Sequence, residues 1–113
     1  MSASPQRRDD WSFAFHVRPV AVEIAGRRLT VTAHEAQLLM GELGRLPRAR
    51  HRAAEETATA LMHGLASNSA VVLDEDSRRC MLRAVEGLRA RGPLPAGVAK
   101  LRLALLRAHA AVL

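Results

Sequence analysis

The sequence contains little cysteine, few aromatic residues and no long apolar run. Cys80 is the only cysteine among 113 residues, which excludes the disulfide-rich scaffolds of small secreted proteins. Aromatic residues make up 3% of the chain, so we expect a core of Leu, Val, Ala and Met. No segment approaches the roughly 18 apolar residues that span a bilayer, and residues 1–10 lack the apolar stretch of a signal peptide. We therefore expect a cytoplasmic protein.

The sequence also lacks the motifs of common catalytic and metal sites. It has no His-Glu-x-x-His motif and no Gly-Lys-Ser/Thr phosphate loop. Its adjacent carboxylates fall near the N-terminus and in the first turns of predicted helices, where capping and the helix dipole explain them. Cys80 lies well inside a predicted helix, where a buried structural thiol fits better than a reactive one. We therefore predict no catalytic residue, no metal and no cofactor.

The net charge of +6 comes almost entirely from arginine, because Lys100 is the only lysine among 17 basic residues. Arg48, Arg50 and Arg52 form the densest basic segment, beside the start of a predicted helix. Arginines in this position could contact the phosphates of duplex DNA, although a solvated loop is the simpler explanation. The segment contains no aromatic residue for base stacking, which argues against single-stranded nucleic acid.

Alternating apolar and polar residues predict strands in the first third of the chain. One strand is predicted over residues 13–18, and a β-hairpin follows it. A two-residue turn that begins at Gly26 would pair Ile24 with Leu29. A short third strand is predicted over residues 70–73, which completes a small antiparallel sheet.

Four helices are predicted from the spacing of apolar residues. Thr32 and Glu35 match the capping-box pattern at the start of the first helix, and Pro47 closes it. Asp74 is a favourable N-cap for the third helix. The second, third and fourth helices are predicted over residues 53–65, 75–91 and 98–112.

These elements define an α+β fold with a small antiparallel sheet and four helices. Residues 1–12 are predicted to form a disordered N-terminal tail, and residues 13–113 to form a single compact domain. A chain of this length buries roughly two-thirds of its unfolded surface. One core is therefore sufficient without disulfides or metal.

An internal repeat is suggested when the sequence is aligned with itself at a shift of 42 residues. This shift places the N-cap Thr32 over the N-cap Asp74. The same shift places the predicted strand at residues 29–31 over residues 71–73. Each half then contains one strand and two helices, which is the pattern of a β-α-α duplication. Two unrelated units that share their capping residues explain the pattern equally well.

The last predicted helix is apolar on two sides. One strip begins at Val98, and the second strip contains Leu103, Leu106 and Ala110. A helix at the surface of a monomer needs only one apolar strip. The second strip must therefore be buried as well, as in a central helix, or lie in a dimer interface.

These features favour a non-enzymatic regulatory or adaptor protein that acts through protein–protein interaction. The second apolar strip of the last helix predicts a homodimer, in which the same residues of two copies meet. The alternative is a DNA-binding transcriptional regulator that uses the basic segment, residues 48–52. A small enzyme with an active site at a dimer interface is a third hypothesis, because such a site leaves little trace in one sequence.

Overall fold

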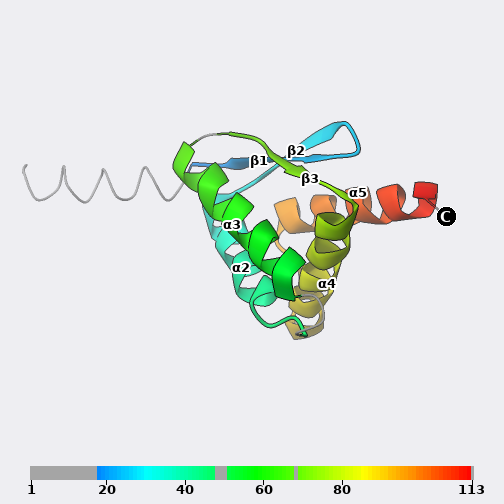
Figure 1. Cartoon of the computed structure of the whole chain (residues 1–113). Helices are drawn as coiled ribbons and strands as arrows, with labels where there is room; N and C mark the ends of the chain where they lie inside the picture. The colour runs from blue at the N-terminus through cyan, green and yellow to red at the C-terminus, as the bar shows by residue number, and fades with distance from the viewer. Residues whose placement is uncertain (1–17, 48–50, 68, 113) are drawn as a thin grey trace, which may run out of the picture.

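The computed structural model describes residues 18–47, 51–67 and 69–112, and within these ranges the chain forms an α+β fold (Figure 1). Three strands form one sheet, and four helices lie together on one side of it. In chain order the elements are β1 (Val20–Ile24), β2 (Arg27–Val31), α2 (Ala33–Leu43), α3 (His51–Ser67), β3 (Val71–Leu73), α4 (Glu75–Arg91) and α5 (Ala96–Val112). The predicted fold class is confirmed. The strand predicted over residues 13–18 lies almost entirely outside the described residues.

The hairpin is present, but its register differs from the prediction. Its turn is Ala25-Gly26, with φ angles of 49° and 82°. Two consecutive positive φ angles are typical of the type I′ turn, whose twist matches that of the flanking strands. The turn therefore lies one residue earlier than predicted, so Ile24 pairs with Arg27 and Leu29 pairs with Val22. This shift of two residues leaves each side chain on its predicted face of the sheet.

The third strand is also present, but it pairs in parallel with β1 and not antiparallel as predicted. Val22 lies opposite Val71, and Ile24 lies opposite Leu73. The sheet is therefore mixed, with the strand order β2-β1-β3. The helices α2 and α3 run in opposite directions and return the chain to the end of the sheet where β1 begins (Figure 1). The chain then enters β3 in the same direction as β1.

Both predicted helix starts are confirmed. The Thr32 hydroxyl accepts a hydrogen bond from the Glu35 backbone N–H at 3.0 Å, and the Glu35 carboxylate accepts one from the Thr32 backbone N–H at 2.8 Å. The Asp74 carboxylate accepts the Ser77 backbone N–H at 2.8 Å. The helix α2 ends earlier than predicted, because Gly44 caps it and Leu46 lies in the turn that follows.

The core is aliphatic, as the composition predicts, and lies between the sheet and the helices. Its largest fully buried side chains come from both layers: Ile24, Leu39, Leu43, Leu61, Met81, Leu101 and Leu105. Cys80 is buried in the same core, as predicted. On the outer face of the sheet Val72 is 69% exposed.

The two halves suggested by the repeat lie around the central strand. The strands β2 and β3 flank β1 and run in opposite directions. The helices that follow them, α2 and α4, pack against each other. The later helices break this relation, because α3 packs against α4 whereas α5 has no comparable contact with α2. The approximate two-fold relation is thus limited to one strand and one helix of each half.

Candidate functional site

A groove of about 680 Å³ lies between α4 and α5. Its apolar floor is formed by Leu46, Leu82, Leu105 and Ala108. Its rim is charged and contains Glu75, Arg78, Arg79, Arg83, Glu86 and His109. An apolar floor with a few charged side chains around it is typical of a binding site. We refer to this feature as the α4–α5 groove.

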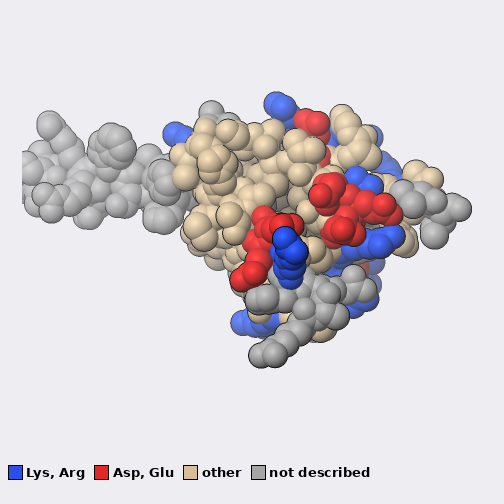
Figure 2. All heavy atoms as spheres, viewed as in Figure 1, with Lys and Arg blue, Asp and Glu red and all other residues tan. Residues whose placement is uncertain are grey.

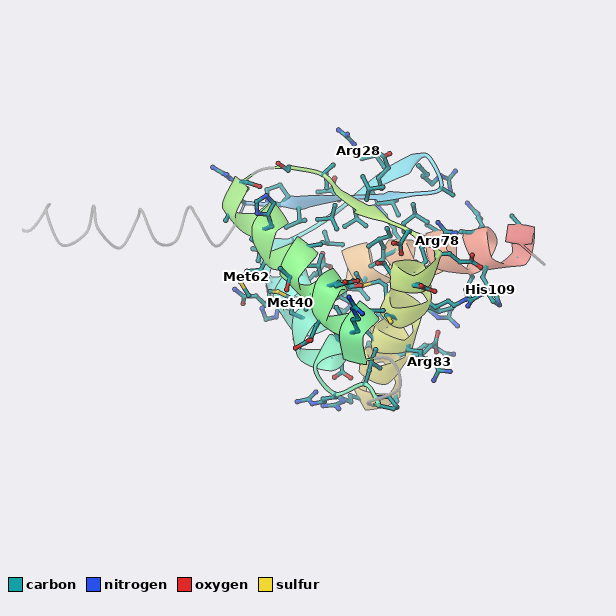
Figure 3. The ribbon with its side chains drawn as sticks, in the orientation of Figure 1. Arg28, Met40, Met62, Arg78, Arg83 and His109 are labelled. Carbon is teal, nitrogen blue, oxygen red and sulfur yellow. The ribbon has the colours of Figure 1, made fainter. Side chains whose placement is uncertain are left out.

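The groove follows from helical spacing in two segments that are distant in the sequence. The rim and floor residues of α4 recur every three or four positions from Glu75 to Glu86, so they share one face over about three turns. The helix α5 adds Leu105 and its neighbours on the facing side. Arg78, Arg83 and His109 lie on the side of the molecule where α4 and α5 meet (Figure 3).

One carboxylate connects the two walls of the groove. Glu86 accepts a hydrogen bond from the Arg102 guanidinium at 2.7 Å and lies 3.4 Å from Arg89. The hydrogen bond from Arg102, together with the charges of both arginines, holds the pKa of Glu86 below its ordinary value. Because Arg102 belongs to α5 and Glu86 to α4, this ion pair links the two helices.

The remaining rim arginines differ in how far they are neutralised. Arg79 is paired with Glu75 at 2.9 Å. Arg78 donates a hydrogen bond to the Leu73 carbonyl oxygen at 3.3 Å, and its charge also helps to lower the pKa of the nearby Asp74 carboxylate. Arg83 is exposed, and no carboxylate of the described ranges lies within 4.0 Å of it. The rim therefore has an excess of positive charge.

The outer strip of α5, defined here as Leu103, Leu106 and Ala110, is a second surface feature. Leu103 is 53% exposed, Ala110 is exposed and Leu106 is half-buried. The opposite strip of the same helix is buried in the core: Val98, Leu101, Leu105 and Ala108. The outer strip is therefore not part of the core of the chain, and the hypothesis of a helix buried on both sides is wrong.

Charge is unevenly distributed over the face shown in Figure 2. Charged side chains gather over α4 and α5, whereas the part over the C-terminal half of α3 is uncharged. The sequence explains this contrast, because the segment from Thr57 to Leu73 contains no Asp, Glu, Lys or Arg. Met62 is 61% exposed on this uncharged face, and it lies on the opposite side of the molecule from Arg83 (Figure 3).

Of the three arginines predicted to contact nucleic acid, Arg48 and Arg50 lie outside the described residues. Arg52 lies in the first turn of α3 with its side chain 94% exposed, 3.9 Å from the Glu56 carboxylate. It does not line the α4–α5 groove. The contact with duplex DNA stays a prediction from the sequence.

Two buried glutamates link α2 to later parts of the chain, and the sequence analysis missed both links. Glu35 accepts the backbone N–H of Gly97 at 2.9 Å, in the first turn of α5. Glu42 is paired with Arg45 at 2.7 Å and with Arg91 at 3.3 Å, at the end of α4. Both oxygens of the Glu35 carboxylate accept hydrogen bonds, and Oε2 of Glu42 contacts both arginines, so both glutamates have structural roles. Gly97 and Gly87 lack a side chain where the Glu35 and Glu42 carboxylates approach them, and these two glycines are local signals that could have indicated the close approaches.

Within the described ranges, no three His, Cys, Asp or Glu side chains are grouped closely enough to hold a metal ion. Of the helices in the same ranges, none has the length and apolar character needed to cross a membrane. Comparison with known proteins found no matching family model, no matching curated protein and no matching solved structure.

Proposed function

We propose that this protein is a non-enzymatic regulatory or adaptor protein of the cytoplasm that binds other proteins, and that it forms a homodimer through the outer strip of α5. The observation that carries this proposal is the 53% exposure of Leu103 on a helix whose opposite strip is buried. Full burial of a leucine contributes roughly 1.5–3 kcal/mol, so covering this strip favours association. The thiol of Cys80 in the core suits a reducing compartment.

The shape of α5 supports a helix–helix contact between two copies. Its C-terminal turns extend beyond α4 (Figure 1), so a second helix can reach them. Ala110 has a small side chain and allows two helices to approach closely. A two-fold dimer places the same strip of both copies in contact, so each substitution in the strip acts twice.

The charges beside the strip set the strength of such a dimer. Lys100 and Arg107 are exposed along one edge of α5, and the helix contains no Asp or Glu. Antiparallel or parallel pairing of two α5 helices therefore brings cations near cations. Salt screens this repulsion, so the dimer should be weak at low ionic strength and stronger at higher ionic strength.

Light scattering over a range of protein concentrations tests the proposal. Leu103→Lys should shift the protein to a monomer with an unchanged circular dichroism spectrum, because it adds a fourth Lys or Arg side chain to an already basic helix. Met62→Lys is the matched control, since Met62 is 61% exposed on the uncharged face and should leave the dimer intact. A parent protein that stays monomeric at high micromolar concentration at all salt concentrations contradicts the homodimer.

A further inference from the structure

The α4–α5 groove is a surface separate from the outer strip of α5, with which it shares no residue. Its α4 wall runs from Glu75 to Glu86, which is about 16 Å along a helix at 1.5 Å per residue. This length corresponds to two or three turns of a helix lying alongside. The floor is a row of aliphatic side chains, and the only ring that lines the groove is His109.

The charge of the groove is complementary to an acidic partner. Three arginines line it, against two glutamates: Arg78, Arg79 and Arg83. Both glutamates are already paired with arginines, Glu75 with Arg79 and Glu86 with two others. Arg83 is exposed and has no carboxylate of the described residues within 4.0 Å, and Arg78 is half-buried beside it, so both can attract carboxylates from outside.

We propose that the α4–α5 groove binds an acidic amphipathic helix of another protein. The apolar stripe of that helix covers Leu46 and Leu82, which are half-buried, and its flanking carboxylates pair with Arg78 and Arg83. A helix fits the observations better than an extended segment, because no strand edge lines the groove and no aromatic residue is present to hold a proline-rich peptide.

The test selects peptides from a display library of random 16-residue sequences on the immobilised full-length protein. The expected selection combines Asp or Glu with Leu, Ile or Phe at spacings of three and four residues. The consensus peptide should bind with a Kd that rises with salt concentration. Arg83→Gln should raise this Kd at least tenfold, and Arg78→Gln should raise it as well.

Arg52→Gln is the matched control, because it removes the same charge from a side chain that is 94% exposed and outside the groove. It should change the Kd less than twofold. Equal losses from Arg52→Gln and Arg83→Gln overturn the proposal, because they indicate general attraction to a basic protein. Selection of peptides without acidic residues overturns it too, and so does a selection that yields no binding peptide.

The outcome for the groove is distinguishable from the outcome for the homodimer. If Arg83→Gln, and not Leu103→Lys, abolishes self-association, the groove binds a second copy and the assignment to another protein is wrong. If the parent protein is monomeric but the acidic peptide binds and responds to Arg83→Gln, the homodimer fails and the groove proposal stands.

Discussion

Gly64 is a helical glycine whose replacement by alanine should destabilise the protein, although alanine is the better helix former. It lies in α3 and faces the sheet. A Cβ atom at this position would lie 2.8 Å from Cγ2 of Val71 and 3.1 Å from Cγ1 of Val20. Both valines are buried, with exposures of 4% and 1%. The chain therefore uses glycine here to let α3 lie close to β1 and β3.

Two effects of opposite sign decide the size of the change for Gly64→Ala. Alanine in a helix interior stabilises by roughly 0.5–1 kcal/mol relative to glycine. Forcing an extra methyl group into a packed core costs about 1–3 kcal/mol. The clash is difficult to relieve, because the two valines are β-branched and have restricted χ1 rotamers. We expect a net loss of about 1 kcal/mol.

Gly41→Ala separates the two effects, because Gly41 is an exposed residue of α2 with no atom within 4 Å of the added Cβ. It should raise the free energy of unfolding by roughly 0.5–1 kcal/mol. Urea unfolding followed by circular dichroism measures both variants. The difference between them, about 1–3 kcal/mol, is the packing cost alone. If Gly64→Ala is as stable as Gly41→Ala, the close approach of α3 to the sheet is wrong.

Two further predictions concern the helix caps and acid pH. Thr32→Ala should lower the free energy of unfolding by about 1 kcal/mol in a urea titration, because the Glu35 amide loses its acceptor. Thr32→Ser keeps a hydroxyl and should restore most of the lost stability. A Thr32→Ala variant as stable as the parent contradicts the cap. A hydrogen bond from the Ser77 backbone N–H holds the pKa of Asp74 below its ordinary value. A hydrogen bond from Arg102 does the same for the pKa of Glu86. Their contribution to stability is therefore present above the ordinary carboxyl pKa of about 4 and is lost as the pH falls through the lower folded-state pKa. Asp74→Asn keeps a side-chain acceptor at the cap but cannot titrate, so it should reduce the slope of stability against pH below about pH 4 and leave stability at pH 7 little changed.

The parts of the fold that local sequence determines could be predicted. Thr32 and Asp74 each interact with a residue three positions ahead, so a short window contains both partners of each cap. The burial of alternate residues in β1 likewise follows from a period of two. The predicted hairpin turn was one residue too late in the sequence. Ala25 adopts a positive φ, which alanine seldom takes, so the residue type gives no sign that the turn begins there.

Contacts between distant residues could not be predicted. Glu35 and Gly97 are separated by 62 positions, and the hydrogen bond between them depends on how α2 and α5 are placed around the core. The parallel pairing of β3 depends on the direction in which two helices return the chain, which periodicity does not encode. The α4–α5 groove is of the same kind, because its walls are separate in sequence and each alone is an ordinary amphipathic helix.

The arrangement of α5 gives the two proposed contacts opposite responses to salt. One arc of the helix is buried in the core and its Leu105 forms part of the groove floor, the next contributes His109 to the groove rim, and a third presents Leu103 to solvent. The basic side chains of α5 stand between these arcs, with no acidic residue on the helix to balance them. An acidic helix in the groove is attracted by this charge, so salt weakens its binding, whereas a second α5 against the outer strip is repelled, so salt strengthens that contact. A single salt series, recorded once by peptide binding and once by light scattering, therefore assigns each interaction to its own face of α5.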